Sequence, residues 1–138
     1  MIETLLSVAS KLLSIVAVFQ KANRDRKDRI AIYFEGISKC IDDLVAVRRS
    51  EDAARSGTLR SCTELDTYAE KFLETVGDTI PKPDAEKLAK DLAQACFYRA
   101  LVGEVASTKP EELEHALEQL ERAAGMFKGL SASIRAAP

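Results

Sequence analysis

The only histidine of the chain, His115, lies in the stretch EELEHALEQLE and is the first place to look for chemistry. Glu111 precedes it by four residues and Glu118 follows it by three, so a helix would place all three on one surface. Two carboxylates and an imidazole can bind a metal weakly, but a solvated polar helix face has the same composition. With a single histidine, no cysteine nearby and no second cluster, the sequence predicts no metal site.

The paired acids Asp42-Asp43 and Glu111-Glu112 are the other groups that could act on a substrate. Adjacent residues point about 100° apart on a helix, so neither pair converges on one point. Arg99 and His115 are too distant in sequence to match an RNA-cleaving HEPN bundle. Nucleophile elbows, zinc-protease motifs and phosphate-binding loops are absent from the sequence. We therefore expect a protein that is not an enzyme and needs no cofactor.

Three cysteines, Cys40, Cys62 and Cys96, all fall on apolar helical stripes. Their number is odd and no two have C-x-x-C spacing. Buried free thiols in a reducing compartment are the simplest interpretation.

Hydrophobic residues recur at three- and four-residue steps through nearly the whole chain, and strand signals are scarce. We predict helices over about 2–22, 25–49, 58–76, 84–106 and 108–133, with Asp84 and Thr108 as N-caps of the last two. This pattern predicts an all-α, antiparallel four- to five-helix bundle with a hydrophobic N-terminal helix. A length of 138 residues suits one domain. Within it, 1–22 is the N-terminal helix, 23–106 the bundle helices and 107–138 the C-terminal helix.

The net charge of −2 gives no electrostatic case for a nucleic-acid partner. The charge is unevenly spread, because residues 1–50 hold nine Lys and Arg against six Asp and Glu. The chain starts Met-Ile-Glu, which is acidic where a secretory signal is basic, and Lys11 interrupts the apolar run. We expect the protein to be cytoplasmic when it is inactive.

The N-terminal helix is apolar on more than one face. The outer side, away from Leu5, Leu12 and Phe19, is expected to hold Val8, Ile15 and Val18. A helix that is apolar nearly all round is either enclosed in a core or made for lipid. Both interpretations are open on the pattern alone.

The length and composition of residues 2–22 make membrane insertion marginal. At 1.5 Å per residue the helix would span about 31 Å, against a bilayer core of about 30 Å. Lys11 near its middle costs roughly 2.5–3.5 kcal/mol on insertion scales. The ten Leu, Ile, Val and Phe residues of the span return roughly 3–6 kcal/mol on the same scale. Such a segment suits conditional insertion, soluble while packed and membrane-active once released.

A basic run, RDRKDR, follows the apolar segment. Its cations are Arg24, Arg26, Lys27 and Arg29, beside Asp25 and Asp28. One interpretation is a solvated first helical turn with local ion pairs, and the other is contact with anionic lipid headgroups. Nucleic-acid binding would need more excess charge and interleaved aromatic residues.

Three features of the chain resemble the bacterial Bell domain, which is similar to the fungal HeLo domain and to the killer domain of the necroptosis executioner. They are the apolar N-terminal helix, the charged helix KANRDRKDRIAIYFEGISKCIDDL and the helix TYAEKFLETVGDTI. The resemblance covers about Ile2 to Val105. It implies a membrane-permeabilising, pore-forming cell-death effector of a bacterial immunity or programmed cell death system. The implied inserting residues are Leu5, Leu6, Val8, Leu12, Leu13, Ile15, Val16, Val18 and Phe19.

The resemblance also implies partners. They are the anionic inner leaflet of the cell membrane, reached on activation, and other copies of the chain in an oligomer. Family members usually follow the bundle with an amyloid-signalling motif through which an NLR-type receptor triggers them. The final residues GLSASIRAAP contain no polar, β-prone motif of that kind, so such a receptor would act through a segment not present here. The alternative function is a non-enzymatic helical interaction module, a signalling adaptor for which a homodimer is one option.

Overall fold

The computed structural model describes residues 2–50, 55–106 and 109–137. Helices account for most of this part, and it contains no strand. The helices are α1 (Ile2–Ser14), α2 (Val16–Gln20), α3 (Arg24–Arg49), α4 (Arg55–Ala69), α5 (Phe72–Val76), α6 (Lys82–Ala95), α7 (Tyr98–Glu104) and α8 (Pro110–Ala136). The predicted all-α helical bundle is therefore confirmed.

Three of the five predicted helices are each broken into two. The breaks fall at Ile15, between α4 and α5, and between α6 and α7. At Ile15 the backbone N–H turns to the carbonyl of Leu12, three residues back, and the same tightening joins Lys71 to Tyr68. Periodicity cannot reveal these breaks, because apolar residues continue at helical spacing on both sides of each one.

The helix starts also differ from the predictions. α6 begins at Lys82, before Asp84, with a proline in its first turn where its missing N–H costs nothing. α8 has Lys109 as its N-cap, and the predicted cap Thr108 lies outside the described residues. Asn23 caps α3 as its residue type suggests, because its Oδ1 accepts the backbone N–H of Arg26 at 2.9 Å.

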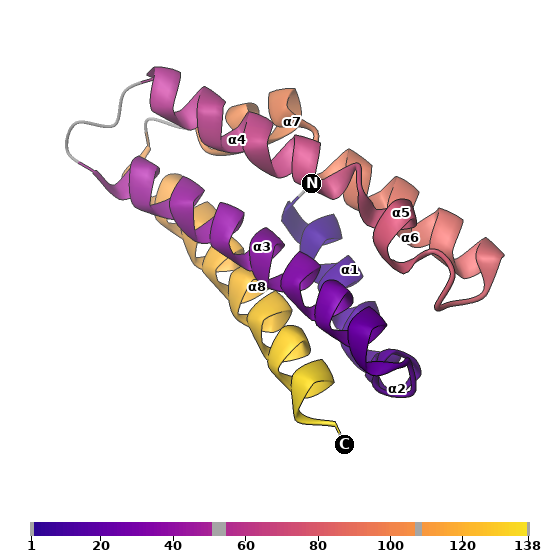
Figure 1. Ribbon diagram of the computed structural model, residues 1–138. Helices are drawn as coiled ribbons and strands as arrows, with labels where there is room; N and C mark the ends of the chain where they lie inside the picture. Colours follow the sequence, from indigo (N-terminus) through magenta and orange to yellow (C-terminus); the bar gives the residue numbers. More distant parts are fainter. Residues whose placement is uncertain (1, 51–54, 107–108, 138) are drawn as a thin grey trace.

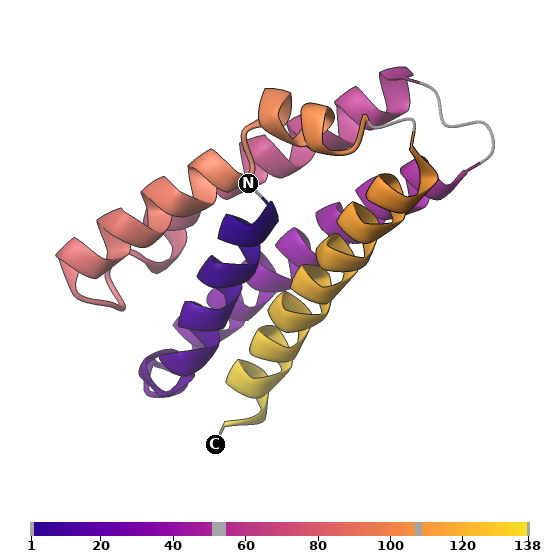
Figure 2. The same ribbon diagram turned by 180° about the vertical axis from the view of Figure 1, so that it is seen from behind.

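Two layers of helices lie on either side of α1 (Figure 1). One layer is the antiparallel pair α3 and α8, and the other contains α4 with α7 and α5 with α6. Seen from behind, α1 runs between the layers (Figure 2), where it packs against α8 on one side and α6 on the other. The N-terminal segment therefore supplies the middle of the core.

The α3–α8 pair is fixed by buried hydrogen bonds as well as by apolar packing. Ser38 Oγ donates to the carbonyl of Ala124 at 2.9 Å, and Ser131 Oγ donates to that of Ala31 at 2.8 Å. Exposed ion pairs flank these bonds, with Arg135 on Glu35 near one end, and Arg49 on Glu114 and Glu121 near the other. Each serine donates to a backbone carbonyl of the other helix, so the two bonds together fix the register of α3 against α8.

Aromatic rings fill the centre of the core. The Phe19 ring meets that of Phe34 edge-on with centroids 5.6 Å apart, and Phe34 lies 6.1 Å from Phe127. These contacts join α2, α3 and α8. Such pairs add about 0.5–1.5 kcal/mol each beyond the area they bury. Phe19 thus anchors the end of the N-terminal segment to both long helices.

Candidate functional site

The nine residues predicted to insert into a membrane all pack against the protein's own core. Leu5, Val8, Leu12 and Phe19 are fully buried. The rest are partly buried against the same core: Leu6, Leu13, Ile15, Val16 and Val18. In this conformation the segment is a core element, as the core-helix interpretation expected.

The prediction that Val8 lies on the outer side of the helix is wrong. Val8 follows Leu5 by three residues and precedes Leu12 by four, so it lies between them on one face, and only 1% of it is exposed. Ile15 and Val18, predicted on the same outer side, are half-buried against the core. The exposed face is polar instead and consists of Glu3, Ser7, Ser10, Lys11 and Ser14. α1 is therefore amphipathic and not apolar all round.

The prediction of one continuous 21-residue helix is also wrong. Ile15 interrupts it with φ −110° and ψ 18°, outside the helical region. α1 alone has 13 residues and is about 20 Å long, short of a bilayer core of about 30 Å. Within the described residues, no helix combines the length and the apolar character that crossing a membrane requires.

The N-terminal segment, which consists of α1 and α2, makes few side-chain hydrogen bonds to the rest of the protein. Gln20 Nε2 donates to the backbone carbonyl of Ser133 on α8 at 3.0 Å. Among the described residues, this is the one side-chain hydrogen bond that joins the segment to another helix. The α3–α8 pair has two buried hydrogen bonds and flanking ion pairs. Apolar contact therefore holds the segment in place almost alone.

The free energy of that apolar contact is large. Fully burying one Leu, Ile, Val or Phe side chain contributes about 1.5–3 kcal/mol. Ile2, Leu5, Val8, Leu12 and Phe19 together contribute about 8–15 kcal/mol, close to the whole stability of an ordinary domain. Moving these side chains into water would cost that free energy, whereas another apolar environment would keep them out of water.

The basic run lies at the corner where α2 turns into α3. Arg24 and Arg29 are exposed, and Arg26 is half-buried beside the turn. Lys27 differs from them, because its Nζ donates to the backbone carbonyl of Ala137 at 3.0 Å, near the end of α8. Of the four cations predicted to meet lipid headgroups, three face solvent at least in part, and Lys27 is engaged within the protein. We call the three solvent-facing cations Arg24, Arg26 and Arg29 the basic corner.

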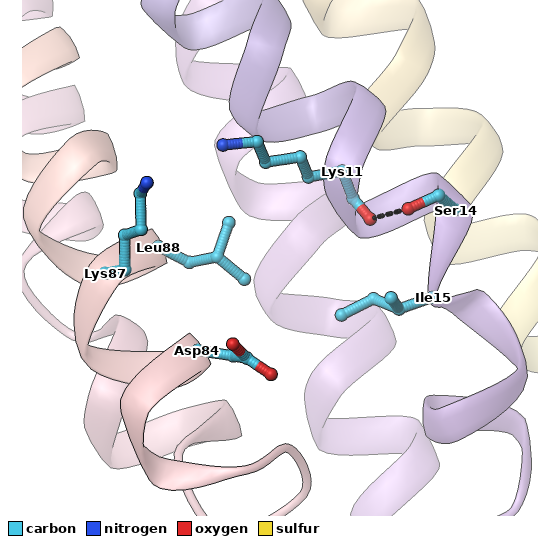
Figure 3. Close-up of a pocket in the computed structure, with 6 residues that line it drawn as sticks. All are labelled: Lys11, Ser14, Ile15, Asp84, Lys87 and Leu88. Atoms are coloured by element: carbon cyan, nitrogen blue, oxygen red, sulfur yellow. Dashed lines mark hydrogen bonds between the residues drawn. The ribbon is translucent and has the colours of Figure 1, made fainter.

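A surface cleft of about 280 Å³ separates the end of α1 from the start of α6. Figure 3 shows Ile15 and Leu88 facing each other across it, with Lys11 and Lys87 directed toward one end and Asp84 turned in at the other. Ser14 Oγ is occupied, since it donates to the carbonyl of Lys11 at 2.6 Å. Sequence reasoning missed this cleft, because only the fold brings α1 and α6 together.

The groups first considered for chemistry do not converge on a site. His115 is exposed on α8, and the described residues hold no group of three or more His, Cys, Asp or Glu side chains suited to a metal. Cys62 and Cys96 are buried free thiols, as predicted, while Cys40 is only half-buried. Burial raises the pKa of the Cys62 thiol to about 11 and that of Cys96 further, so neither is a ready nucleophile near neutral pH.

Comparison of the chain with protein-family models, curated proteins and solved structures finds no match. The resemblance to the Bell domain stays a prediction.

Proposed function

We propose that this chain is a membrane-permeabilising, pore-forming effector domain that acts by releasing its N-terminal segment onto an anionic bilayer and oligomerising there. The cell-death and bacterial immunity role, with a cytoplasmic resting state and action at the cell membrane, follows from the resemblance to Bell domains. The observation that carries the proposal is the attachment of the segment. Among the described residues, it relies on apolar contact and one side-chain hydrogen bond to another helix, from Gln20.

A bilayer can replace the apolar contacts that hold the segment in the core, because its hydrocarbon also shields apolar side chains from water. Leaving the core for water costs the burial of five large side chains, whereas leaving it for lipid keeps them out of water. An amphipathic helix with a polar face and a large apolar face binds at the lipid–water boundary, which needs no spanning length. On this proposal α1 first lies in the interface, and α1 and α2 join into a longer helix only within an oligomer.

The basic corner supports the same orientation. It follows the N-terminal segment directly, so a bilayer that receives the segment also meets Arg24 and Arg29. Each cation near an anionic surface contributes about 1 kcal/mol. Arg24→Gln with Arg29→Gln should weaken binding to anionic vesicles, most strongly at low salt. Arg60→Gln on α4, which removes an exposed arginine distant from the basic corner in sequence, should leave binding unchanged.

A reversible tether tests the release of the segment. Gln20→Cys with Ser133→Cys places two thiols where α2 meets α8, and a short thiol cross-linker that a reductant cleaves would hold the segment in place. Glu35→Cys with Arg135→Cys forms a matched tether between α3 and α8, which need not separate. Both proteins are fused to a ligand-inducible oligomeriser and mixed with dye-loaded anionic vesicles.

We expect the Gln20–Ser133 tether to abolish dye release and reductant to restore it, while the control tether has no effect. Equal leakage with both tethers would refute insertion of the segment. A tether is needed because deletion of residues 1–22, or Val8→Asp, alters core packing in the resting protein under either function, so neither change separates the two candidates.

The second candidate is a non-enzymatic helical interaction module, a signalling adaptor that acts through a homodimer or a protein partner. Complete burial of Leu5, Val8 and Leu12 favours it, since an ordinary core helix has the same environment. Under this function the clustered, untethered protein releases no dye from anionic vesicles, and the tether changes neither its association state nor its stability beyond the gain from cross-linking.

A further inference from the structure

The cleft between α1 and α6 holds charged groups that the protein itself does not pair. Lys11 comes from α1, and Asp84 and Lys87 come from α6. Within the described residues none of the three makes an ion pair or a side-chain hydrogen bond through its charged group. Elsewhere on the surface, the exposed cations Arg49, Lys109 and Arg135 do pair with carboxylates.

The two lysines are directed toward the same end of the cleft from opposite walls (Figure 3). Like charges that face each other across two packed helices repel. An anionic group placed between Lys11 and Lys87 would remove that repulsion and bridge α1 to α6.

The middle and the other end of the cleft restrict what such an anion can be attached to. Ile15 and Leu88 face each other as an apolar pair, which suits a short hydrocarbon body. Asp84 is turned in beyond them, so it repels a second anionic charge and attracts an amine. The volume of about 280 Å³ limits the occupant to a small molecule.

We propose that this cleft binds a small amphipathic zwitterion, with its anionic group between Lys11 and Lys87, its hydrocarbon body between Ile15 and Leu88, and its amine on Asp84. Because the walls belong to different helices and Ile15 is the break between α1 and α2, the occupant holds the N-terminal segment against α6. Binding itself is independent of the proposed function, whereas its use as a brake on membrane activity rests on that function.

The probe is 6-aminohexanoate, compared with hexanoate, which lacks the amine, and hexylammonium, which lacks the carboxylate. Titrations of the isotope-labelled chain, followed by NMR, report both affinity and place. We expect saturable shifts confined to the end of α1 and the first turns of α6, and affinity in the order zwitterion, hexanoate, hexylammonium.

Two variants test the charged groups of the cleft one at a time, and a third variant is the control. Lys87→Ala should weaken binding of 6-aminohexanoate by about fivefold, and Asp84→Asn should weaken it while leaving hexanoate binding unchanged or tighter. Lys90→Ala, on the same helix but outside the cleft, is the matched control and should have no effect. No saturable binding, equal affinity for all three probes, or shifts outside the cleft would overturn the proposal.

The brake is tested separately by adding saturating 6-aminohexanoate to the dye-release assay. Slower release for the parent protein but not for Lys87→Ala supports the brake. Unchanged release despite confirmed binding refutes the brake and leaves the site intact. Absence of release without ligand would instead refute the proposed function.

Discussion

Gly36, in the middle of α3, is covered by the side chain of Tyr68 from α4. A Cβ added at Gly36 would overlap the phenol at Oη and Cζ, so Gly36→Ala forces the ring to move. The ring is partly buried and can swing toward solvent. Moving it breaks the stack of Tyr68 on Tyr33, whose rings lie 5.1 Å apart at 16°, and a weak hydrogen bond from Tyr68 Oη to the carbonyl of Ile32 at 3.4 Å.

The magnitude follows from two opposing effects. Gly→Ala within a helix stabilises by about 0.5–1 kcal/mol when the space is free. Displacing Tyr68 costs about 0.5–1.5 kcal/mol for the aromatic pair and about 1 kcal/mol for the strain of overpacking. We therefore expect Gly36→Ala to lower the free energy of unfolding by about 1 kcal/mol. In a Tyr68→Ala background the clash is gone, and the same change should raise it by about 0.5–1 kcal/mol.

Urea denaturation of the four proteins of this double-mutant cycle measures both values. Gly129→Ala on α8 is the matched control, since nothing lies within 4 Å of a Cβ added there, and it should stabilise the parent protein by about 0.5–1 kcal/mol. If Gly36→Ala stabilised the parent protein as much as Gly129→Ala does, Tyr68 would not cover Gly36, and the packing of α4 on α3 described here would be refuted.

Three other predictions concern the α3–α8 pair and the thiols. Ser38→Ala and Ser131→Ala should each lower the free energy of unfolding by about 0.5–1.5 kcal/mol in urea denaturation, and no loss from either would mean that these bonds do not fix the two helices. Alkylation at pH 8, followed by mass spectrometry, should modify half-buried Cys40 first and Cys96 last, and an early reaction of Cys96 would contradict its burial. Burial raises the pKa of Cys62 from 9.0 to about 11, so the unfolded chain loses that proton first and stability should fall as pH rises from about 9 toward 11. Cys62→Ala should reduce this dependence, and an unchanged pH profile would count against the shift.

The class of fold was predictable because the apolar period of 3.6 residues is strong. It correctly indicated the extent of α3, which Asn23 caps in the structure. The breaks at Ile15 and around Phe97 were not predictable, since neither residue breaks a helix by itself. Tertiary packing sets the positions of the breaks between α4 and α5 and between α6 and α7. The turns there let α4 pack against α7 while α5 packs against α6.

The candidate site was predictable only in part. The composition of the N-terminal segment indicated that it must avoid water, but not whether protein or lipid surrounds it. The spacing of Val8 to Leu5 and Leu12 is that of one helical face, so the burial of Val8 was predictable from the sequence although the prediction placed it outside. The link between Gln20 and Ser133 spans 113 residues, and no local pattern predicts such a contact. The cleft lined by Lys11 and Lys87 was hidden for the same reason.

The central claim is that the N-terminal segment leaves the bundle core when the protein acts on a membrane. Pulsed electron-spin distance measurements test it directly, with spin labels on exposed Ser10 of α1 and exposed Gly129 of α8, and with Cys40 replaced by Ser. A second pair, Asp42 of α3 and Gly129, reports on the part that should stay together. With clustered protein on anionic vesicles, we predict that the Ser10–Gly129 distance increases by about 10 Å or more, the width of a helix, while the control distance stays fixed. Dye release with both distances unchanged would contradict the account.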